Sequence, residues 1–317
     1  VGYYKDISNA VNLPMIVYNF PAFSGVNLSV EQMSEFLCDE RFIGVKHTSN
    51  DYFAMAADKL QYAWLSINSQ LVGSLYSIGN NAFACDGSLS RYATANSKIK
   101  YMEFIADISS IGQNAFYGTR LEQFTLPDSV TTIGDRAFAK SSIVTFMINN
   151  TSEAITFGNY VFEGSPNLEN VYLTPNIQTV GVGLFKDCLS LGSSDAGFDL
   201  SLVTWTELPA ETFRGCITLK SVTLSNSITK IGDYSFAGCS ILEGASFTNQ
   251  LTHVGEYAFS ECNALSGLNF GTMIVEIGED AFYKTPKLAT VYLAVEEDFV
   301  PGQPWGAESF TDIIWRN

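Results

Sequence analysis

One phrase recurs along most of this chain and constrains its fold more than any other feature. Its clearest copy is Ile231-Gly232-Asp233-Tyr234-Ser235-Phe236-Ala237-Gly238-Cys239, and the full unit reads I-G-x-x-A-F-x-x-C-x-x-L-x-x-V-x-L. A unit of about 22–24 residues cannot bury its apolar side alone, so stacked units are expected to share one continuous core. The phenylalanine of the phrase recurs at Phe83, Phe116, Phe138, Phe162, Phe185, Phe213, Phe236, Phe259 and Phe282.

Two further patterns accompany this phenylalanine. An apolar residue stands five positions before each copy: Ile78, Ile111, Ile133, Phe157, Val180, Leu208, Ile231, Val254 and Ile277. After each copy comes a phrase such as Leu219-x-x-Val222-x-Leu224, whose last three positions alternate apolar and polar residues. That alternation predicts one short strand per repeat with a single buried face. The nine phenylalanines are expected to be buried, each ring in contact with the next.

The same alternation predicts which side chains lie on the exposed face of the sheet. This face is neutral, with polar and aromatic residues mixed, and its groups do not form an acid–base pair or a metal-ligand set, so no catalysis, metal or cofactor is predicted there. Two interpretations stay open: an ordinary solvated face, or a binding surface for a protein or glycan with Tyr172 and Tyr292 as anchors. The candidate binding residues are Thr125, Met147, Tyr172, Asn269 and Tyr292.

The repeat is interrupted between Ser194 and Leu208. The stretch from Gly192 to Gly197 is typical of a loop, and Trp205 is expected to be exposed or packed against it. The interruption is either a tolerated insertion or a recognition loop.

The first sixty residues differ from the repeats. Apolar strands are expected over residues 14–20 and 42–46, with a helix from Ser29 to Cys38 between them. Strand, helix and strand with continuously apolar strands predict a parallel βαβ unit. Reactive groups in such units sit at the carboxyl ends of the strands, where Tyr18 and Lys46 both fall.

The stretches LPMIVYNFPAFSGVNLS and GVKHTSND, over about residues 1–55, resemble the N-acetylneuraminate lyases among the Schiff-base aldolases. The resemblance implies a fragment of a (β/α)8 barrel in which Lys46 condenses with the keto carbon and Tyr18 shuttles a proton. A buried lysine at a strand end has a lowered pKa and a usable amine. The carboxylate-binding loop and sugar-binding strands of the family have no counterpart here, so we expect a vestigial site.

The repeats, over about residues 65–317, resemble the BspA-like class of leucine-rich repeats, which occurs largely in microbial cell-surface proteins. The expected fold is α+β: a solenoid over residues 59–317 preceded by the βαβ fragment over residues 1–58. The expected function is interaction or adhesion, with a protein or glycan partner, at the cell surface or after secretion. The alternative is an N-acetylneuraminate lyase with a repeat appendage, and we favour the non-enzymatic interpretation.

Charge and composition narrow the partners further. The formal net charge of −16 makes nucleic acid an unfavourable partner. No run of eighteen apolar residues occurs, so no membrane span is expected, and no targeting leader is expected in a chain that starts at Val1. Cys216, Cys239 and Cys262 recur every 23 residues, which indicates one buried column of free thiols. With His47 and His253 as the two histidines, no zinc site is predicted.

Overall fold

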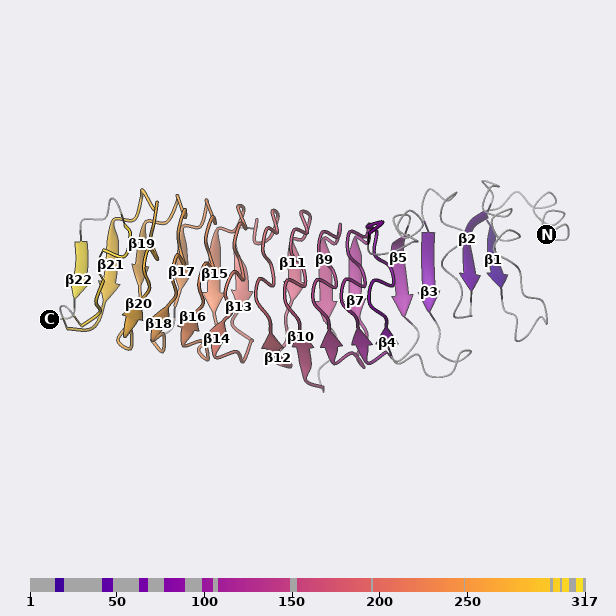
Figure 1. Cartoon of the computed structure of the whole chain (residues 1–317), viewed down its shortest axis with the longest axis horizontal. Coiled ribbons are helices and arrows are strands. Elements are labelled where there is room, and N and C mark those ends of the chain that lie inside the picture. Colours follow the sequence, from indigo (N-terminus) through magenta and orange to yellow (C-terminus); the bar gives the residue numbers. More distant parts are fainter. Residues whose placement is uncertain are drawn as a thin grey trace.

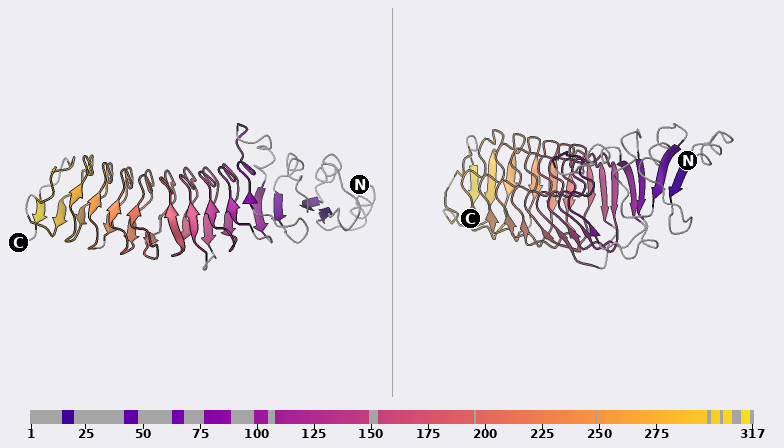
Figure 2. Two further views of the ribbon diagram at one scale, coloured as in Figure 1. Left: turned by 60° about the horizontal axis from the view of Figure 1, so that its bottom comes forward. Right: turned by 45° about the vertical axis from the view of Figure 1, so that its right-hand side comes forward.

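The computed structural model is a long stack of coils that follow one another along a single axis, as all three ribbon views show (Figures 1 and 2). It describes residues 15–19, 42–47, 63–67, 77–88, 99–104, 108–148, 153–194, 196–247, 249–296, 299–302, 304–307 and 312–315. Within these ranges every regular element is a β-strand. The described part is therefore all-β, whereas the sequence predicts α+β, and the helix expected over residues 29–38 lies outside it.

The first strand row runs along one side of the stack and carries the strands that the sequence predicts. Its strands pair in parallel, and their outward and inward side chains alternate, as the pattern eBeB in β7 shows. The row consists of three sheets: β7 (Gln123–Leu126), β9 (Thr145–Ile148) and β11 (Asn170–Tyr172); β13 (Phe198–Leu200), β15 (Ser221–Leu224) and β17 (Gly244–Ser246); and β19 (Gly267–Asn269), β21 (Thr290–Leu293) and β22 (Asp312–Trp315).

A second strand row lies on another side of the coils, so the prediction of one strand per repeat is wrong. Most of its strands have only two residues, too few to show the alternation by which a strand is recognised in sequence. The apolar column five positions before each phenylalanine lies on these strands and is buried, except at Val180, which is partly buried. The row consists of β4 (Ser77–Ile78), β6 (Ser110–Ile111), β8 (Thr132–Ile133), β10 (Ile155–Phe157) and β12 (Ile177–Val180), and then β14 (Glu207–Leu208), β16 (Lys230–Ile231), β18 (His253–Val254) and β20 (Glu276–Ile277).

Two further pairs of parallel strands lie toward the N-terminal end of the row (Figure 1). β1 (Met15–Asn19) pairs with β2 (Phe42–His47), and β3 (Ala63–Ile67) pairs with β5 (Ile99–Phe104). β1 and β2 coincide with the two strands expected near the start of the chain and are parallel to each other. The expected domain boundary at residue 58 lies outside the described residues.

The nine phenylalanines form one buried stack through the middle of the coils, as predicted. Neighbouring ring centroids are 5.0 Å apart for Phe116 and Phe138 and 6.1 Å apart for Phe259 and Phe282, with the other pairs between these values. Trp305 continues the column, its centroid 6.1 Å from that of Phe282. The indole N–H of Trp305 donates to the carbonyl of Pro301 over 2.8 Å, which satisfies its polar atom inside the core.

The glycine of the repeat marks the closest approach between coils. A Cβ placed on Gly232 would lie 2.5 Å from the backbone nitrogen of Ala210, and one on Gly255 would lie 2.6 Å from that of Asp233. The backbone there donates across the gap, because Gly255 N–H reaches the carbonyl of Ile231 over 2.8 Å. Only a residue without a side chain allows this spacing.

A column of small polar side chains lies beside the phenylalanine stack. The thiol of Cys239 donates to the carbonyl of Phe213 in the preceding coil over 3.1 Å, and Cys188, Cys216 and Cys262 make the same contact in their own coils. All four of these cysteines are free and buried, as predicted for Cys216, Cys239 and Cys262. The sequence pattern misses the remaining members of the column, which are the buried hydroxyls of Thr119, Ser141, Ser165 and Thr285.

Removing one ring from the stack should destabilise the whole solenoid. Phe236 is fully buried between Phe213 and Phe259, so we expect Phe236→Ala to lower the free energy of unfolding by about 3–5 kcal/mol. The control Ile217→Ala removes an exposed side chain and should change it by less than about 0.5 kcal/mol. Urea denaturation followed by circular dichroism measures both. Equal effects of the two substitutions would contradict the central role of the stack.

The buried thiols should make the protein sensitive to alkaline pH. Burial raises the pKa of Cys188, Cys216, Cys239 and Cys262 above the ordinary value of 9.0. Above about pH 9 the unfolded chain releases these protons while the folded chain retains them, so stability falls as pH rises. The expected slope is about 1.4 kcal/mol per pH unit for each thiol.

The measurement is the urea midpoint in reducing buffer, recorded from neutral to alkaline pH. The comparison is a variant with all four cysteines replaced by serine, the residue that already occupies this column at Ser141 and Ser165. Its stability should fall less steeply with pH. Parallel curves for the two proteins would show that the thiols do not govern the alkaline transition.

Candidate functional site

The outward face of the first strand row is the candidate site, since it holds every binding residue that the sequence predicts. Thr125 pairs with Met147, and Met147 pairs with Tyr172, on the adjacent strands β7, β9 and β11. Asn269 pairs with Tyr292 on β19 and β21. The predicted residues therefore form two groups, one near each end of the row, rather than one cluster.

The two tyrosines are the most prominent side chains on this face. Tyr172 is 58% exposed and Tyr292 is 45% exposed, while Met147 is partly buried. Asn269 has a local role as well, because its side-chain oxygen accepts a hydrogen bond from the backbone N–H of Gly271 over 3.1 Å. Tyr172 and Tyr292 thus present rings that a partner could cover, whereas Met147 and Asn269 are held partly by the fold.

The strands between the two groups carry small outward side chains, which are uncharged except at Asp199. Thr223 and Ser246 point outward from the middle sheet, and Gly244 adds no side chain there at all. Among the described strand residues from β7 to β21, Asp199 is the single charged side chain on this face, and it accepts a hydrogen bond from the backbone of Ser201 over 2.7 Å. Such a surface offers hydrogen-bonding and stacking groups rather than ionic or acid–base chemistry.

The interruption of the repeat forms an irregular coil that is packed into the solenoid. Trp205 is buried, and its indole N–H donates to the carbonyl of Ile177 over 2.8 Å. Phe198, on strand β13, packs edge-on against Phe185 at 5.2 Å and Phe213 at 5.5 Å. Of the two positions expected for Trp205, the packed one is found, although its partner is the coil before the loop rather than the loop itself.

The N-terminal strands place the two residues of the predicted lyase site next to each other. Tyr18 on β1 and Lys46 on β2 are paired residues in the parallel register. The register places the backbones of both residues near the carboxyl ends of neighbouring strands. It agrees with the expected position of the pair, and the catalytic role stays a prediction.

A ridge of aromatic and charged side chains follows the turns at the phenylalanine positions, which sequence reasoning missed. Arg136 lies over the ring of Tyr160 at 4.9 Å, and Lys186 lies over the same ring at 5.5 Å. Lys186 is also paired with Glu211. Burial works against the charged form of Glu211, yet the hydrogen bond from Lys186 and the nearby Arg214 hold the pKa of that carboxyl below its usual value.

The signal for this ridge is present in the sequence as a column two positions before each phenylalanine. Tyr160, Tyr234 and Tyr257 occupy that column, and the rings of Tyr234 and Tyr257 stack 5.0 Å apart. The backbone there has positive φ, 56° at Tyr234 and 52° at Tyr257. The groups of the ridge bind one another, so it is a structural brace and offers no open catalytic group.

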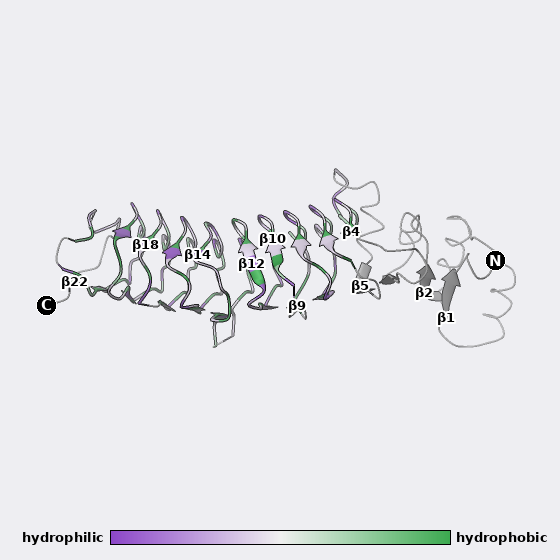
Figure 3. Cartoon of the chain, turned by 90° about the horizontal axis from the view of Figure 1, so that it is seen from below, coloured by the Kyte–Doolittle hydropathy of each residue, from purple (hydrophilic) through white to green (hydrophobic). Residues whose placement is uncertain are grey.

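The second strand row changes character along its length. The residues that face away from its buried column are hydroxyls in the first strands, at Ser110, Thr132 and Thr156. From β14 onward they are charged or ionisable, at Glu207, Lys230, His253 and Glu276. The hydropathy colouring of β14 and β18 shows the same change (Figure 3). His253 lies 3.8 Å from Glu276. Groups of three or more possible metal ligands are absent from the described residues.

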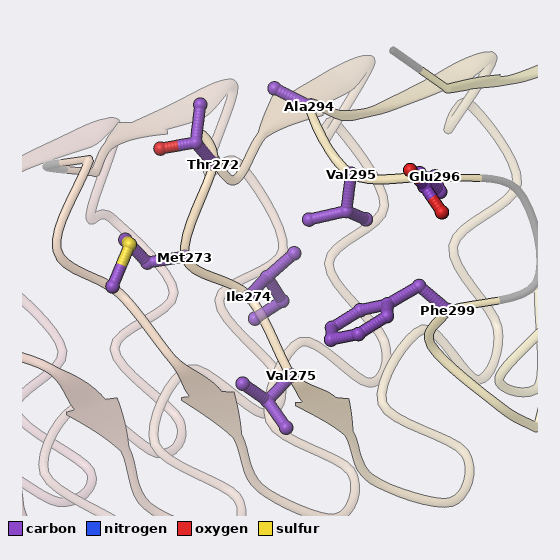
Figure 4. Close-up of a pocket in the computed structure, with 8 residues that line it drawn as sticks. All are labelled: Thr272, Met273, Ile274, Val275, Ala294, Val295, Glu296 and Phe299. Carbon is purple, nitrogen blue, oxygen red and sulfur yellow. The ribbon is translucent and has the colours of Figure 1, made fainter.

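A depression of about 660 Å³ lies beside the last coils, on the segments that connect the two strand rows (Figure 4). Met273, Val275 and Phe299 are exposed there, whereas the preceding coil has Gln250 and Thr252 at the positions equivalent to Met273 and Val275. The apolar character is thus confined to this end of the solenoid. The lining residues are Thr272, Met273, Ile274, Val275, Ala294, Val295, Glu296 and Phe299.

Within the part of the chain that the structure describes, no helix is long and apolar enough to cross a membrane.

Comparison with known proteins divides the chain in two. Residues 1–82 match the dihydrodipicolinate synthetase family. N-acetylneuraminate lyase from Clostridium perfringens is 40% identical over 53 residues, which is 17% of this chain and 18% of the lyase. N-acetylneuraminate lyase 2 from Escherichia coli is 46% identical over 55 residues, again 17% of this chain and 18% of the lyase. The chain therefore spans less than a fifth of the length of these curated relatives.

Solved structures resemble the solenoid. A leucine-rich repeat protein from Bacteroides ovatus matches with a TM-score of 0.62 and 20% identity, over 87% of this chain and 82% of that chain. One from Eubacterium ventriosum matches with a TM-score of 0.51 and 17% identity, over 90% and 76%. At these identities the likeness shows the fold alone. The BspA type leucine rich repeat region matches residues 87–204 and 198–299, which is more than half of the chain, and the protein therefore belongs to the BspA-type leucine-rich repeat family.

Proposed function

We propose that this protein is a cell-surface or secreted adhesion protein that binds a protein or glycan partner through the outward face of the first strand row. The supporting observation is that this face is uncharged from β7 to β21, except at Asp199, in a chain with a net charge of −16. Charge keeps a surface solvated and free of contacts, so its exclusion from one long face favours contact with a partner. Membership of the BspA-type family supports the surface location.

A bulky cation placed in the middle of this face should block adhesion. Thr223→Arg places the cation on β15 of the first strand row, and the matched control Thr156→Arg makes the same substitution at an exposed strand position of β10 in the second row. We expect beads coated with the Thr223→Arg protein to lose about nine-tenths of their binding to epithelial cells and mucin-coated surfaces. Beads coated with the control should bind as the unchanged protein does.

Flow microscopy counts the bound beads, and thermal unfolding confirms that both variants are folded. If the two substitutions reduce adhesion equally, or if neither does, the partner does not bind on the first strand row and the proposal is wrong.

A second candidate function is lyase activity at Lys46, which is favoured by the register of Tyr18 with Lys46 and by the identity to N-acetylneuraminate lyases. We propose that this site is vestigial. Schiff-base chemistry needs the keto acid held in a fixed orientation, and orientation supplies much of the rate. Within the described strands, β1 and β2 form a sheet of two strands and β3 pairs with β5. That arrangement differs from a closed barrel, in which the neighbouring strands complete the site.

Trapping with borohydride tests this proposal directly. We expect incubation with pyruvate and sodium borohydride to leave Lys46 unlabelled by mass spectrometry, under conditions that label an intact N-acetylneuraminate lyase stoichiometrically. N-acetylneuraminate should also remain uncleaved. Stoichiometric trapping that is abolished by Lys46→Ala would contradict this and place the enzyme function first.

A further inference from the structure

We propose that the partner of the first strand row is an uncharged glycan chain, which lies along the axis of the solenoid and stacks on Tyr172 and Tyr292. This inference rests on the proposed function and specifies the chemical class of its partner. Three features of the face support it: its charge, the distribution of its apolar groups, and the open surface and spacing between the two tyrosines.

The charge distribution disfavours an ionic partner of either sign. The face itself offers Asp199, whose carboxylate already accepts a backbone hydrogen bond, and the exposed Asp312 on its last strand, β22. Acids stand just outside the strands, as at Glu169 and Glu243, which are both exposed. These acids and the net charge of −16 repel polyanions such as sulfated or sialylated glycans. A cationic partner would find few carboxylates on the strands themselves. An uncharged ligand is not repelled by the acids and does not need carboxylates on the strands.

The apolar groups are also unlike those of a typical protein interface. Such an interface has a contiguous apolar centre in which a few large side chains contribute most of the binding energy. Here Tyr172 and Tyr292 are separated by the middle sheet, whose outward residues include Thr223, Gly244 and Ser246. Each ring has one apolar neighbour on the adjacent strand, Met147 beside Tyr172 and Ile314 beside Tyr292, and the strands between the two rings carry hydroxyl and amide groups. Two separated stacking positions match a sugar chain, because each sugar ring has an apolar C–H face for stacking and a rim of hydroxyls for hydrogen bonds.

The geometry suits an extended ligand. Tyr172 and Tyr292 are five coils apart, and a strand spacing of nearly 5 Å places them about 25 Å from each other along the row. A Cβ on Gly244 would meet no atom within 4 Å, and its φ is not in the left-handed region. The surface between the tyrosines is therefore open enough for a chain to lie on it. A ligand that reaches both rings gains from two contacts at once.

The test measures binding of the purified protein to uncharged polysaccharides, namely mannan, laminarin, dextran and N-acetylglucosamine oligomers of increasing length. Affinity electrophoresis screens them and calorimetry measures the affinity of those that bind. Tyr172→Ala and Tyr292→Ala should each weaken binding about tenfold, the effect of losing one anchor. Gly244→Arg should abolish it, since an arginine there stands in open space between the rings. Tyr283→Ala removes an exposed tyrosine that packs edge-on against Tyr257 of the ridge, away from the first strand row, and should leave the affinity unchanged.

Ligand length provides a second readout. Affinity for the unchanged protein should rise once an oligomer is long enough to reach both rings, and that rise should disappear in Tyr172→Ala and in Tyr292→Ala. None of the substituted positions is buried, so thermal unfolding should match that of the unchanged protein.

The possible outcomes separate this inference from the proposed function. If no uncharged polysaccharide binds, while bead adhesion still depends on Thr223 and survives periodate oxidation of surface glycans, the partner is a protein and the glycan inference is overturned. Stronger binding to polygalacturonate than to the uncharged polysaccharides would overturn it as well. If adhesion is also insensitive to Thr223→Arg, the proposed function itself fails.

Discussion

The approach of one coil to the next, at about the spacing of paired strands, is the constraint on which the rest of the structure depends. Each phenylalanine of the repeat donates its backbone N–H to the following coil, as Phe236 does to the carbonyl of Ala258 over 2.8 Å, and its ring stacks on the next ring. Glycine at Gly232 and Gly255 makes this approach possible. Since each coil contacts only its neighbours, stability accumulates along the stack.

This constraint also determines where function can reside. The interior of each coil is occupied by the phenylalanine stack and by the column of thiols and hydroxyls that donate to its carbonyls, which leaves the outer surfaces for recognition. The turn ridge is braced by contacts such as that of Lys186 with Tyr160 and Glu211. The second strand row carries its own charged ladder from Glu207 to Glu276. The first strand row is the long face that combines exposed rings with uncharged neighbours, and it is there that we place the partner.

The N-terminal strands combine two features: their sequence is similar to that of a lyase, and they form a parallel pair at the end of a solenoid. Tyr18 and Lys46 keep adjacent positions in the register. Parallel strands are the common feature of an aldolase barrel and of the strand rows of this solenoid. A parallel strand pair similar in sequence to part of a lyase is thus compatible with a solenoid that begins with parallel pairs.

The sequence by itself determined the period, the buried phenylalanine and apolar columns, the free thiol column and the outward residues of the first strand row. Each of these features repeats at a fixed spacing, so several copies in the sequence indicate the same buried or exposed position. Only the tertiary structure decided that there is a second strand row, that Thr119, Ser141, Ser165 and Thr285 share the column of the cysteines, and that Trp205 is buried against Ile177. The second row was missed because two-residue strands are too short to show an alternating pattern. The hydroxyls were missed because chemically different residues can fill one buried position. The position of Trp205 could not be predicted because it depends on contacts between residues distant in sequence.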